Sequence, residues 1–306
     1  MFLIFPLIIL ILAVLGISYY CFRIAFYVKR REKTDEIFVP EGEIYEPYHE
    51  DMIRWIKEVR AMPHENFEIT SFDGLKLRAK YYEYEKGAPI EIMFHGYRGS
   101  AESDLSGAVQ RCFNLKRNAF IVDQRCSGES EGNVITFGVN EHKDCLRWID
   151  FVISHFGKEV KILITGISMG ASTVMIAAGK ELPENVVGAL ADCGYSSQKE
   201  IIKLVIKKMG LPKNLSYPFV KLAAKIYGHF DLEEITPIES LKNCKIPIIF
   251  IHGETDDFVP CYMSKDCFDV CPSKKMLVTV PDAGHGLAYL KDNPGYYKAL
   301  REFFAE

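Results

Sequence analysis

The sequence predicts an α/β fold in which a mostly parallel central sheet carries helices on both faces. Short apolar runs of strand length alternate with longer segments of helical pattern from residue 90 onward, as in parallel strands joined by crossover helices. Gly166-Ile167-Ser168-Met169-Gly170 stands between one such run and a segment of small residues. About 260 residues follow an apolar N-terminal segment, which suits one large α/β domain.

The N-terminal segment is predicted to be a membrane anchor with a basic flank, residues 1–33. Residues 2–22 carry no charged side chain, and about 20 apolar residues span a bilayer core. Because basic residues tend to stay in the cytoplasm, we expect a single-pass anchor at the cell membrane and a cytoplasmic domain. A cleaved signal peptide is the alternative, but it needs its basic residues before the apolar run. Here they follow it: Arg23, Lys29, Arg30, Arg31 and Lys33.

Composition argues against two kinds of ligand, nucleic acids and metal ions. A net charge of −4 gives no reason to expect nucleic-acid binding. The nine cysteines are scattered, and Cys267 and Cys271 have no companion histidine nearby. We therefore expect free thiols in a reducing compartment and no metal site.

A polar linker, residues 34–64, is expected to lead through a short helix near 50–61 into the main domain, residues 65–306. The first part of that domain, residues 66–84, is predicted to be a β hairpin. Its turn is Asp73-Gly74, a pair that readily adopts the positive φ such a turn requires.

The remaining chain alternates between the two kinds of element. The expected strands are 90–94, 119–123, 160–165, 186–192, 246–251 and 276–280. The expected helices are 101–116, 138–156, 170–181, 261–271 and 294–305.

Residues 196–241 interrupt this alternation, because they are far longer than one crossover helix. An insertion here follows a strand, and ligands of open α/β sheets bind at the C-terminal ends of strands. We therefore expect a helical cap over the active site. Its basic residues either form a solvated helix face or lean on an anionic membrane surface or an acidic substrate. They are Lys199, Lys203, Lys207, Lys208, Lys213, Lys221 and Lys225.

Ser168 is the predicted nucleophile. A strand, a sharp turn and a helix are the context that exposes a serine oxygen at the edge of a sheet. Gly128-Glu129-Ser130-Glu131-Gly132 matches the same pattern. Ser130 lies in a polar loop with no helix directly after it, so we interpret it as loop structure.

A serine hydroxyl needs a neighbouring base, and that base needs a carboxylate to orient it. Pro281-Asp282-Ala283-Gly284-His285-Gly286 follows the last expected strand, and His285 is the best candidate for the base. Asp256 is the preferred acid, with Asp257 as its immediate rival and Asp192 as a more distant one. His252, in a strand-end turn, is interpreted as structural.

An oxyanion requires two backbone N–H donors. One is expected from Met169, which follows the nucleophile. The other is expected from Tyr97, in the loop His95-Gly96-Tyr97 after the strand 90–94.

These segments together resemble the α/β-hydrolase superfamily over most of the chain after the linker. The matching positions are His95-Gly96, the turn at Ser168, Asp256 with Val259-Pro260, and Gly284-His285. The resemblance favours Asp256 over Asp257, because the acid in such enzymes usually stands three residues before that valine. More narrowly, the chain is similar to membrane-anchored bacterial hydrolases of the serine aminopeptidase-like and lysophospholipase-like groups.

The expected function is therefore hydrolysis of an ester or thioester through an acyl-enzyme, with a small lipophilic acyl substrate and no cofactor. A peptidase acting on short or acylated peptides is the alternative within enzymes. A hydrolase-like protein that binds a ligand without turnover is the alternative outside them. The sequence makes no prediction of oligomeric state.

Overall fold

The computed structural model of the chain describes residues 4–29 and 35–304. Arg30, Arg31 and Lys33, three members of the predicted basic flank, lie outside the described residues.

The fold is built on one eight-stranded sheet in the order β1-β2-β4-β3-β5-β6-β7-β8. Strands β3 to β8 pair in parallel, while β2 pairs antiparallel with both β1 and β4. The predicted mostly parallel sheet and N-terminal hairpin are thus confirmed. The strands are β1 Glu65–Thr70, β2 Lys76–Tyr82, β3 Ile90–Phe94, β4 Asn118–Asp123, β5 Ile162–Ile167, β6 Val186–Asp192, β7 Ile248–Gly253 and β8 Lys275–Val280.

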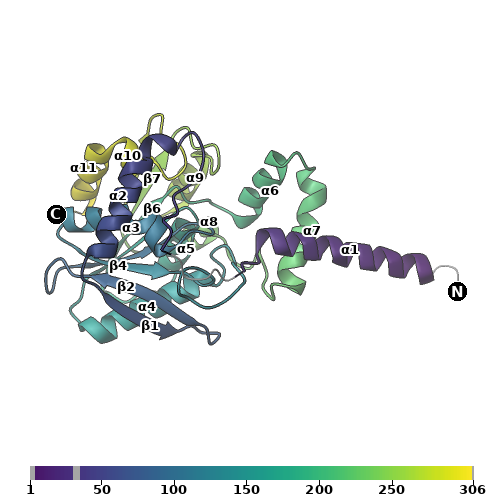
Figure 1. Ribbon diagram of the computed structural model, residues 1–306, viewed down its shortest axis with the longest axis horizontal. Coiled ribbons are helices and arrows are strands. Elements are labelled where there is room, and N and C mark those ends of the chain that lie inside the picture. Colours follow the sequence, from purple (N-terminus) through teal and green to yellow (C-terminus); the bar gives the residue numbers. More distant parts are fainter. Residues whose placement is uncertain (1–3, 30–34, 305–306) are drawn as a thin grey trace.

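Helices cover both faces of this sheet, as Figure 1 shows. Side chains alternate across a strand, so Ile92 and Phe94 of β3 join the core beneath one helix layer, whereas Met93 joins the core of the other. The first layer contains α4 Glu141–Phe156, α5 Met169–Ala178, α8 Pro237–Leu241 and α9 Tyr262–Val270. The second contains α2 His49–Ala61, α3 Ala101–Asn114, α10 Ala288–Lys291 and α11 Asn293–Phe304.

Several element boundaries differ from the prediction for local reasons. Strand β7 begins at Ile248, two residues late, because Pro247 has no N–H to donate to a neighbouring strand. Helix α5 begins at Met169, since the turn at Ser168 leads directly into it, and it ends before Gly179. The α2 range, His49–Ala61, agrees with the expected short helix.

The segment expected as a cap divides into two parts. Helices α6 Gln198–Lys208 and α7 Lys213–Ile226 form a hairpin that extends sideways from the domain, next to α1 Ile4–Ala25 (Figure 1). Helix α8 packs instead against α5 and α9 and belongs to the layer covering the sheet. The separate helical insertion therefore ends well before residue 241.

Helix α1 is long and apolar enough to cross a membrane. It has 22 residues and a mean hydropathy of 2.4, and only 6% of its most apolar stretch is buried. Its C-terminal end is nevertheless fixed to the domain. Phe22 and Phe26 are buried in one core cluster with residues of α7, and Tyr27 forms a β bridge with Val134.

Candidate active site

Ser168 lies on a strained turn between β5 and α5. Its backbone has φ 55° and ψ −115°, a region that residues with a side chain rarely adopt. A Cβ atom at Gly166 would collide with the backbone of Gly170, and one at Gly170 would collide with the carbonyl of Phe94. Both positions therefore need glycine, and the two glycines let β5, α5 and the end of β3 approach closely enough to hold this conformation.

Two further segments bring a base and an acid to this serine. His285 lies in the loop after β8, and its Nε2 is 2.9 Å from the Oγ of Ser168. The other ring nitrogen, Nδ1, is 2.7 Å from Oδ2 of Asp256, in the loop after β7. The C-terminal ends of β5, β7 and β8 meet at one edge of the sheet, which explains how three distant segments form one chain of hydrogen bonds.

The carboxylate of Asp256 is held in its charged form. Its Oδ1 accepts hydrogen bonds from the amides of Phe258 and Val259, and the ring of His252 lies 3.2 Å from Oδ2. Burial works against ionisation, but the contacts with His252 and His285 prevail and lower the pKa of Asp256 to about 2. A carboxylate that is ionised at neutral pH and contacts Nδ1 leaves Nε2 of His285 free to accept a proton from Ser168.

The side chains of the two rival acids have other partners. Asp257 is 78% exposed in its side chain and forms an ion pair with Lys208 of α6. Asp192 accepts a hydrogen bond from the hydroxyl of Tyr296 at 2.8 Å. Of the three carboxylates weighed from the sequence, Asp256 is the one in contact with His285.

The expected oxyanion donors lie beside Ser168. Met169 is the first residue of α5, and the loop containing Tyr97 follows β3, where a Cβ at Gly96 would lie 3.5 Å from the Cβ of Ser168. This loop is fixed because the Gly96 amide donates to Oδ2 of Asp104 at 2.9 Å. Within residues 4–29 and 35–304, neither the Tyr97 nor the Met169 amide has a hydrogen-bond partner, so both amides remain candidates for that role.

The remaining polar residues that the sequence raised serve the scaffold. Ser130 Oγ donates to the carbonyl of Asp123 and accepts from the amide of Arg78. The ring of His95 is buried and contacts the Gly96 carbonyl and the Gln124 amide. Both arrangements hold loops in place.

A cavity of about 410 Å³ lies over Ser168 and His285. No lining residue from the described part of the chain belongs to 196–241. The sequence placed the cover of the site in that insertion, and here the structure differs, because α6 and α7 pack beside α1 instead. The segment before the sheet supplies a large part of the apolar wall, through Phe38, Val39, Tyr45, Met52 and Trp55. Leu290 lines the same cavity.

This covering segment also contacts the base directly. The hydroxyl of Tyr45 donates to the backbone carbonyl of His285 at 3.1 Å. The sequence analysis treated the stretch 34–64 as a polar linker and gave its aromatic residues no role. Aromatic side chains concentrated in an otherwise polar linker were the signal that this linker docks on the domain.

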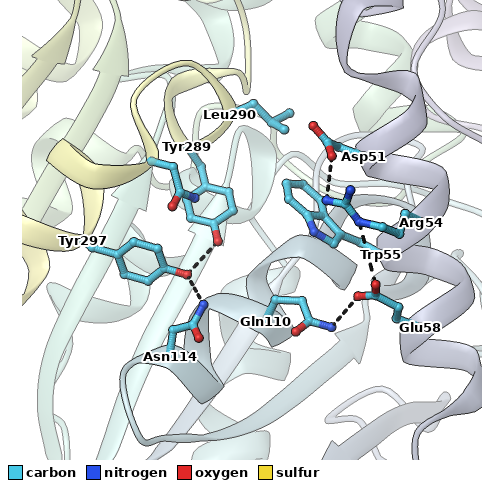
Figure 2. A pocket seen from close by; sticks show the side chains of 10 residues that line it. Asp51, Arg54, Trp55, Glu58, Gln110, Asn114, Tyr289, Leu290 and Tyr297 are labelled. Atoms are coloured by element: carbon cyan, nitrogen blue, oxygen red, sulfur yellow. Dashed lines mark hydrogen bonds and ion pairs between the residues drawn. The ribbon is translucent and has the colours of Figure 1, made fainter.

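A second pocket, of about 440 Å³, lies on the other side of Trp55 (Figure 2). It shares Trp55, Tyr289 and Leu290 with the first cavity, but its other lining side chains are polar. Arg54 forms an ion pair with Asp51 at 2.6 Å. No residue of the Ser168 hydrogen-bond chain lines this pocket.

Cys193, Asp256 and His285 are the described residues whose donor atoms lie close enough together to share a metal ion. Burial raises the pKa of the Cys193 thiol well above its ordinary value, so the sulfur is a neutral thiol. Both nitrogens of His285 already have partners in Ser168 and Asp256. The donor set therefore suits proton transfer better than metal binding.

The sheet order, the crossover helices and the serine turn between β5 and α5 define an α/β-hydrolase. Within that class the chain belongs to the prolyl oligopeptidase family, whose family model matches residues 135–306. The chain is thus a serine-hydrolase-like α/β protein.

Relatives and solved structures agree with this class. The chain is 24% identical over 238 residues to the uncharacterized protein YqkD of Bacillus subtilis, covering 78% of each chain. It is 23% identical over 255 residues to the uncharacterized membrane protein YNL320W of Saccharomyces cerevisiae, covering 81% of each. The Pyrococcus furiosus esterase Pf2001 shares the fold with a TM-score of 0.65 at 19% identity, over 90% of this chain and 98% of the esterase.

Proposed function

We propose that this protein is a membrane-anchored serine hydrolase that cleaves esters or thioesters of a lipophilic acyl group. The observation that carries the proposal is the chain of hydrogen bonds from Ser168 through His285 to Asp256, which faces an apolar cavity. Nucleophile, base and orienting carboxylate in this order are what acyl transfer to serine requires.

In the proposed reaction, Ser168 Oγ attacks the acyl carbonyl while Nε2 of His285 takes its proton. Asp256 stabilises the imidazolium that forms, and the amides of Tyr97 and Met169 hold the oxyanion. The C–O or C–S bond of the substrate then breaks, and His285 returns the proton to the leaving group. Water attacks the acyl-enzyme by the same route, which releases the acid and restores Ser168.

The walls of the cavity favour an acyl chain as the part of the substrate that is recognised. Phe38, Val39, Met52 and Leu290 offer only apolar side-chain surface. Each methylene moved from water into such surroundings contributes about 0.8 kcal/mol. Affinity should therefore rise with acyl length until the cavity is full.

Peptide hydrolysis is the second candidate, because the family is described as prolyl oligopeptidases. Attack by an activated serine can cleave a peptide bond as well as an ester or thioester bond. The leaving group distinguishes the two reactions, since peptide hydrolysis releases an amine and ester hydrolysis releases an alcohol.

The anchor in this proposal is α1. Its apolar length and the name of the yeast relative, a membrane protein, support a position in the membrane. Arg23 and Lys29 follow the apolar stretch, which favours a single span with the catalytic domain in the cytoplasm.

A fluorophosphonate probe, which reacts with activated serines, tests the proposed nucleophile. The wild-type protein should be labelled, and Ser168→Ala should lose the label while keeping its thermal unfolding transition. Ser130→Ala, in the second Gly-x-Ser-x-Gly segment, is the matched control and should still be labelled. An unlabelled but folded wild type would favour a protein that binds without turnover.

The substrate class is tested by comparing p-nitrophenyl esters of increasing acyl length with aminoacyl anilides. We expect kcat/KM to rise from acetate toward medium-chain esters and to be far lower for the anilides. Faster anilide hydrolysis at every chain length would make the protein a peptidase.

A further inference from the structure

The turn between α6 and α7 exposes an unusual run of side chains. Every residue from 207 to 215 is exposed. The run includes Met209, Leu211 and Leu215, which are 55%, 48% and 69% exposed. Large apolar side chains gathered at one projecting tip mark a contact surface more often than a solvated loop.

Basic side chains surround these apolar ones. Lys207 and Lys213 flank the turn, and neither forms an ion pair within the described ranges. The opposite faces of both helices are apolar and buried, through residues such as Ile202 and Val220. An apolar tip with lysines beside it is typical of elements that lie in the interface of an anionic bilayer.

Helix α7 crosses α1 within the apolar length of the anchor (Figure 1), which sets the level of the hairpin along α1. The hydroxyl of Tyr227, just after α7, donates to the carbonyl of Leu15 at 3.0 Å, and the rings of Tyr227 and Tyr19 lie 5.3 Å apart. Residues 4–14 lie beyond this crossing and, at ~1.5 Å per residue, cover only about 16 Å of a ~30 Å hydrocarbon core. If α1 spans the bilayer, residues after 14 must therefore also lie in the hydrocarbon core. The point at which α7 crosses α1 is then within the depth of the membrane.

We propose that the α6–α7 hairpin is a second membrane contact, in which residues 207–215 lie in the headgroup region of an anionic phospholipid bilayer. The proposal rests on anchoring by α1. Met209, Leu211 and Leu215 enter the boundary between headgroups and acyl chains, and Lys207 and Lys213 meet lipid phosphates. With two contacts the domain cannot rotate freely about α1, so the cavity keeps one orientation to the membrane.

Fluorescence quenching by brominated lipid tests this contact in the full chain. The chain has two tryptophans, and a third is introduced as Leu215→Trp. The protein is reconstituted in vesicles of phosphatidylcholine with about 30% phosphatidylglycerol, with or without bromine on the acyl chains. The emission added by the new tryptophan should fall by at least half in brominated vesicles.

Tyr84→Trp is the matched control. Tyr84 is 40% exposed and follows the end of β2, which pairs with the beginning of β4. It therefore lies at the edge of the sheet opposite Ser168, and its added emission should be almost unquenched. Equal quenching at positions 84 and 215 would overturn the proposal.

Two further measurements separate the parts of the proposal. Lys207→Gln with Lys213→Gln, in the Leu215→Trp background, should reduce quenching, and unchanged quenching would refute the role of lipid charge. Alkaline carbonate extraction of the parent chain reports on α1 independently. Release of the chain would overturn both the anchor and the hairpin contact, whereas retention without quenching at 215 would overturn the hairpin contact alone.

Discussion

The two cavities on either side of Trp55 have similar volumes but opposite chemistry. One, of about 410 Å³, contains Ser168 and His285 and is walled mainly by apolar side chains. The other, of about 440 Å³, is lined by ion pairs and amides, such as Arg54 with Asp51 (Figure 2). Size therefore does not distinguish a reaction site here. The hydrogen bonds from Ser168 through His285 to Asp256 do, because they join a hydroxyl to a base and a carboxylate, whereas the polar pocket joins the hydroxyls of Tyr289 and Tyr297 to the amide of Asn114.

The largest expected effect is on the rate of ester hydrolysis, and it should distinguish the two cavities. His285→Ala removes the base, so ester hydrolysis should fall by at least about a thousandfold. Tyr297→Phe removes a hydroxyl that accepts a hydrogen bond from Asn114 in the polar pocket, and its rate should stay within about twofold. Steady-state kinetics with one ester measures both. Comparable losses of ester hydrolysis in the two variants would contradict the proposal that the reaction takes place in the Ser168 cavity alone.

Acid stability should depend on Asp256, which contacts His285 beside the apolar cavity. The pKa of Asp256 is about 2 in the folded protein, against an ordinary value of 3.8. The unfolded chain thus binds this proton first as pH falls, and about 2 kcal/mol of stability present above pH 4 is lost toward pH 2. Thermal unfolding of the wild type and Asp256→Asn between pH 4 and pH 2 should show a weaker pH dependence in the variant. Parallel curves of stability against pH for the two proteins would mean that ionisation of Asp256 does not stabilise the fold in this range.

Removing Trp55, which lines both cavities, should have a smaller effect, on the specificity for acyl length. Trp55→Ala should connect the two cavities and lower kcat/KM for short esters roughly tenfold, because apolar contact with the acyl group is lost. Long-chain esters should be affected less, since their tails can extend into the opened space. Trp55→Phe, which keeps an aromatic ring, is the control. An equal loss at every chain length would show that Trp55 does not limit acyl length.

The smallest effect is expected in the polar pocket. Arg54 is 57% exposed and pairs with Asp51 and Glu58 on its own helix, and such pairs contribute about 0.3–0.5 kcal/mol each. Arg54→Gln should lower the free energy of unfolding by less than about 1 kcal/mol, and added salt should shrink the difference. Denaturant titration at low and high salt measures this. A loss of several kcal/mol would show that the pocket is structurally essential.

The sheet and the Ser168 hydrogen-bond chain were predictable because their signals are local. Strands such as 246–251 are continuous apolar runs, and the glycines that mark the turn lie within two residues of Ser168, although Gly170 is required by its approach to Phe94 of β3. The separation of Asp256 from Asp257 also followed from spacing, here through family resemblance. In each case a few consecutive residues determine the outcome.

The cover of the cavity was not predictable in the same way. Segment 38–45 has no periodic pattern, and its docking depends on side chains such as Phe38 meeting a cavity that exists only in the folded protein. The helices at 198–226 do show a helical pattern, but pattern alone cannot say which surface they pack on. Their partner is α1, whose apolar residues had been assigned to lipid alone.

The end of α1 also bears on how the protein should be prepared. The side chain of Tyr97 donates to the carbonyl of Ala25 at 2.9 Å, and Arg98 donates to that of Ile24 at 2.7 Å. Trimming the N-terminus through Ala25 to obtain a detergent-free fragment would remove these two carbonyl acceptors and expose the core cluster around Phe26. The loop that carries the Tyr97 amide would lose these contacts, so low activity of such a fragment would not describe the intact protein.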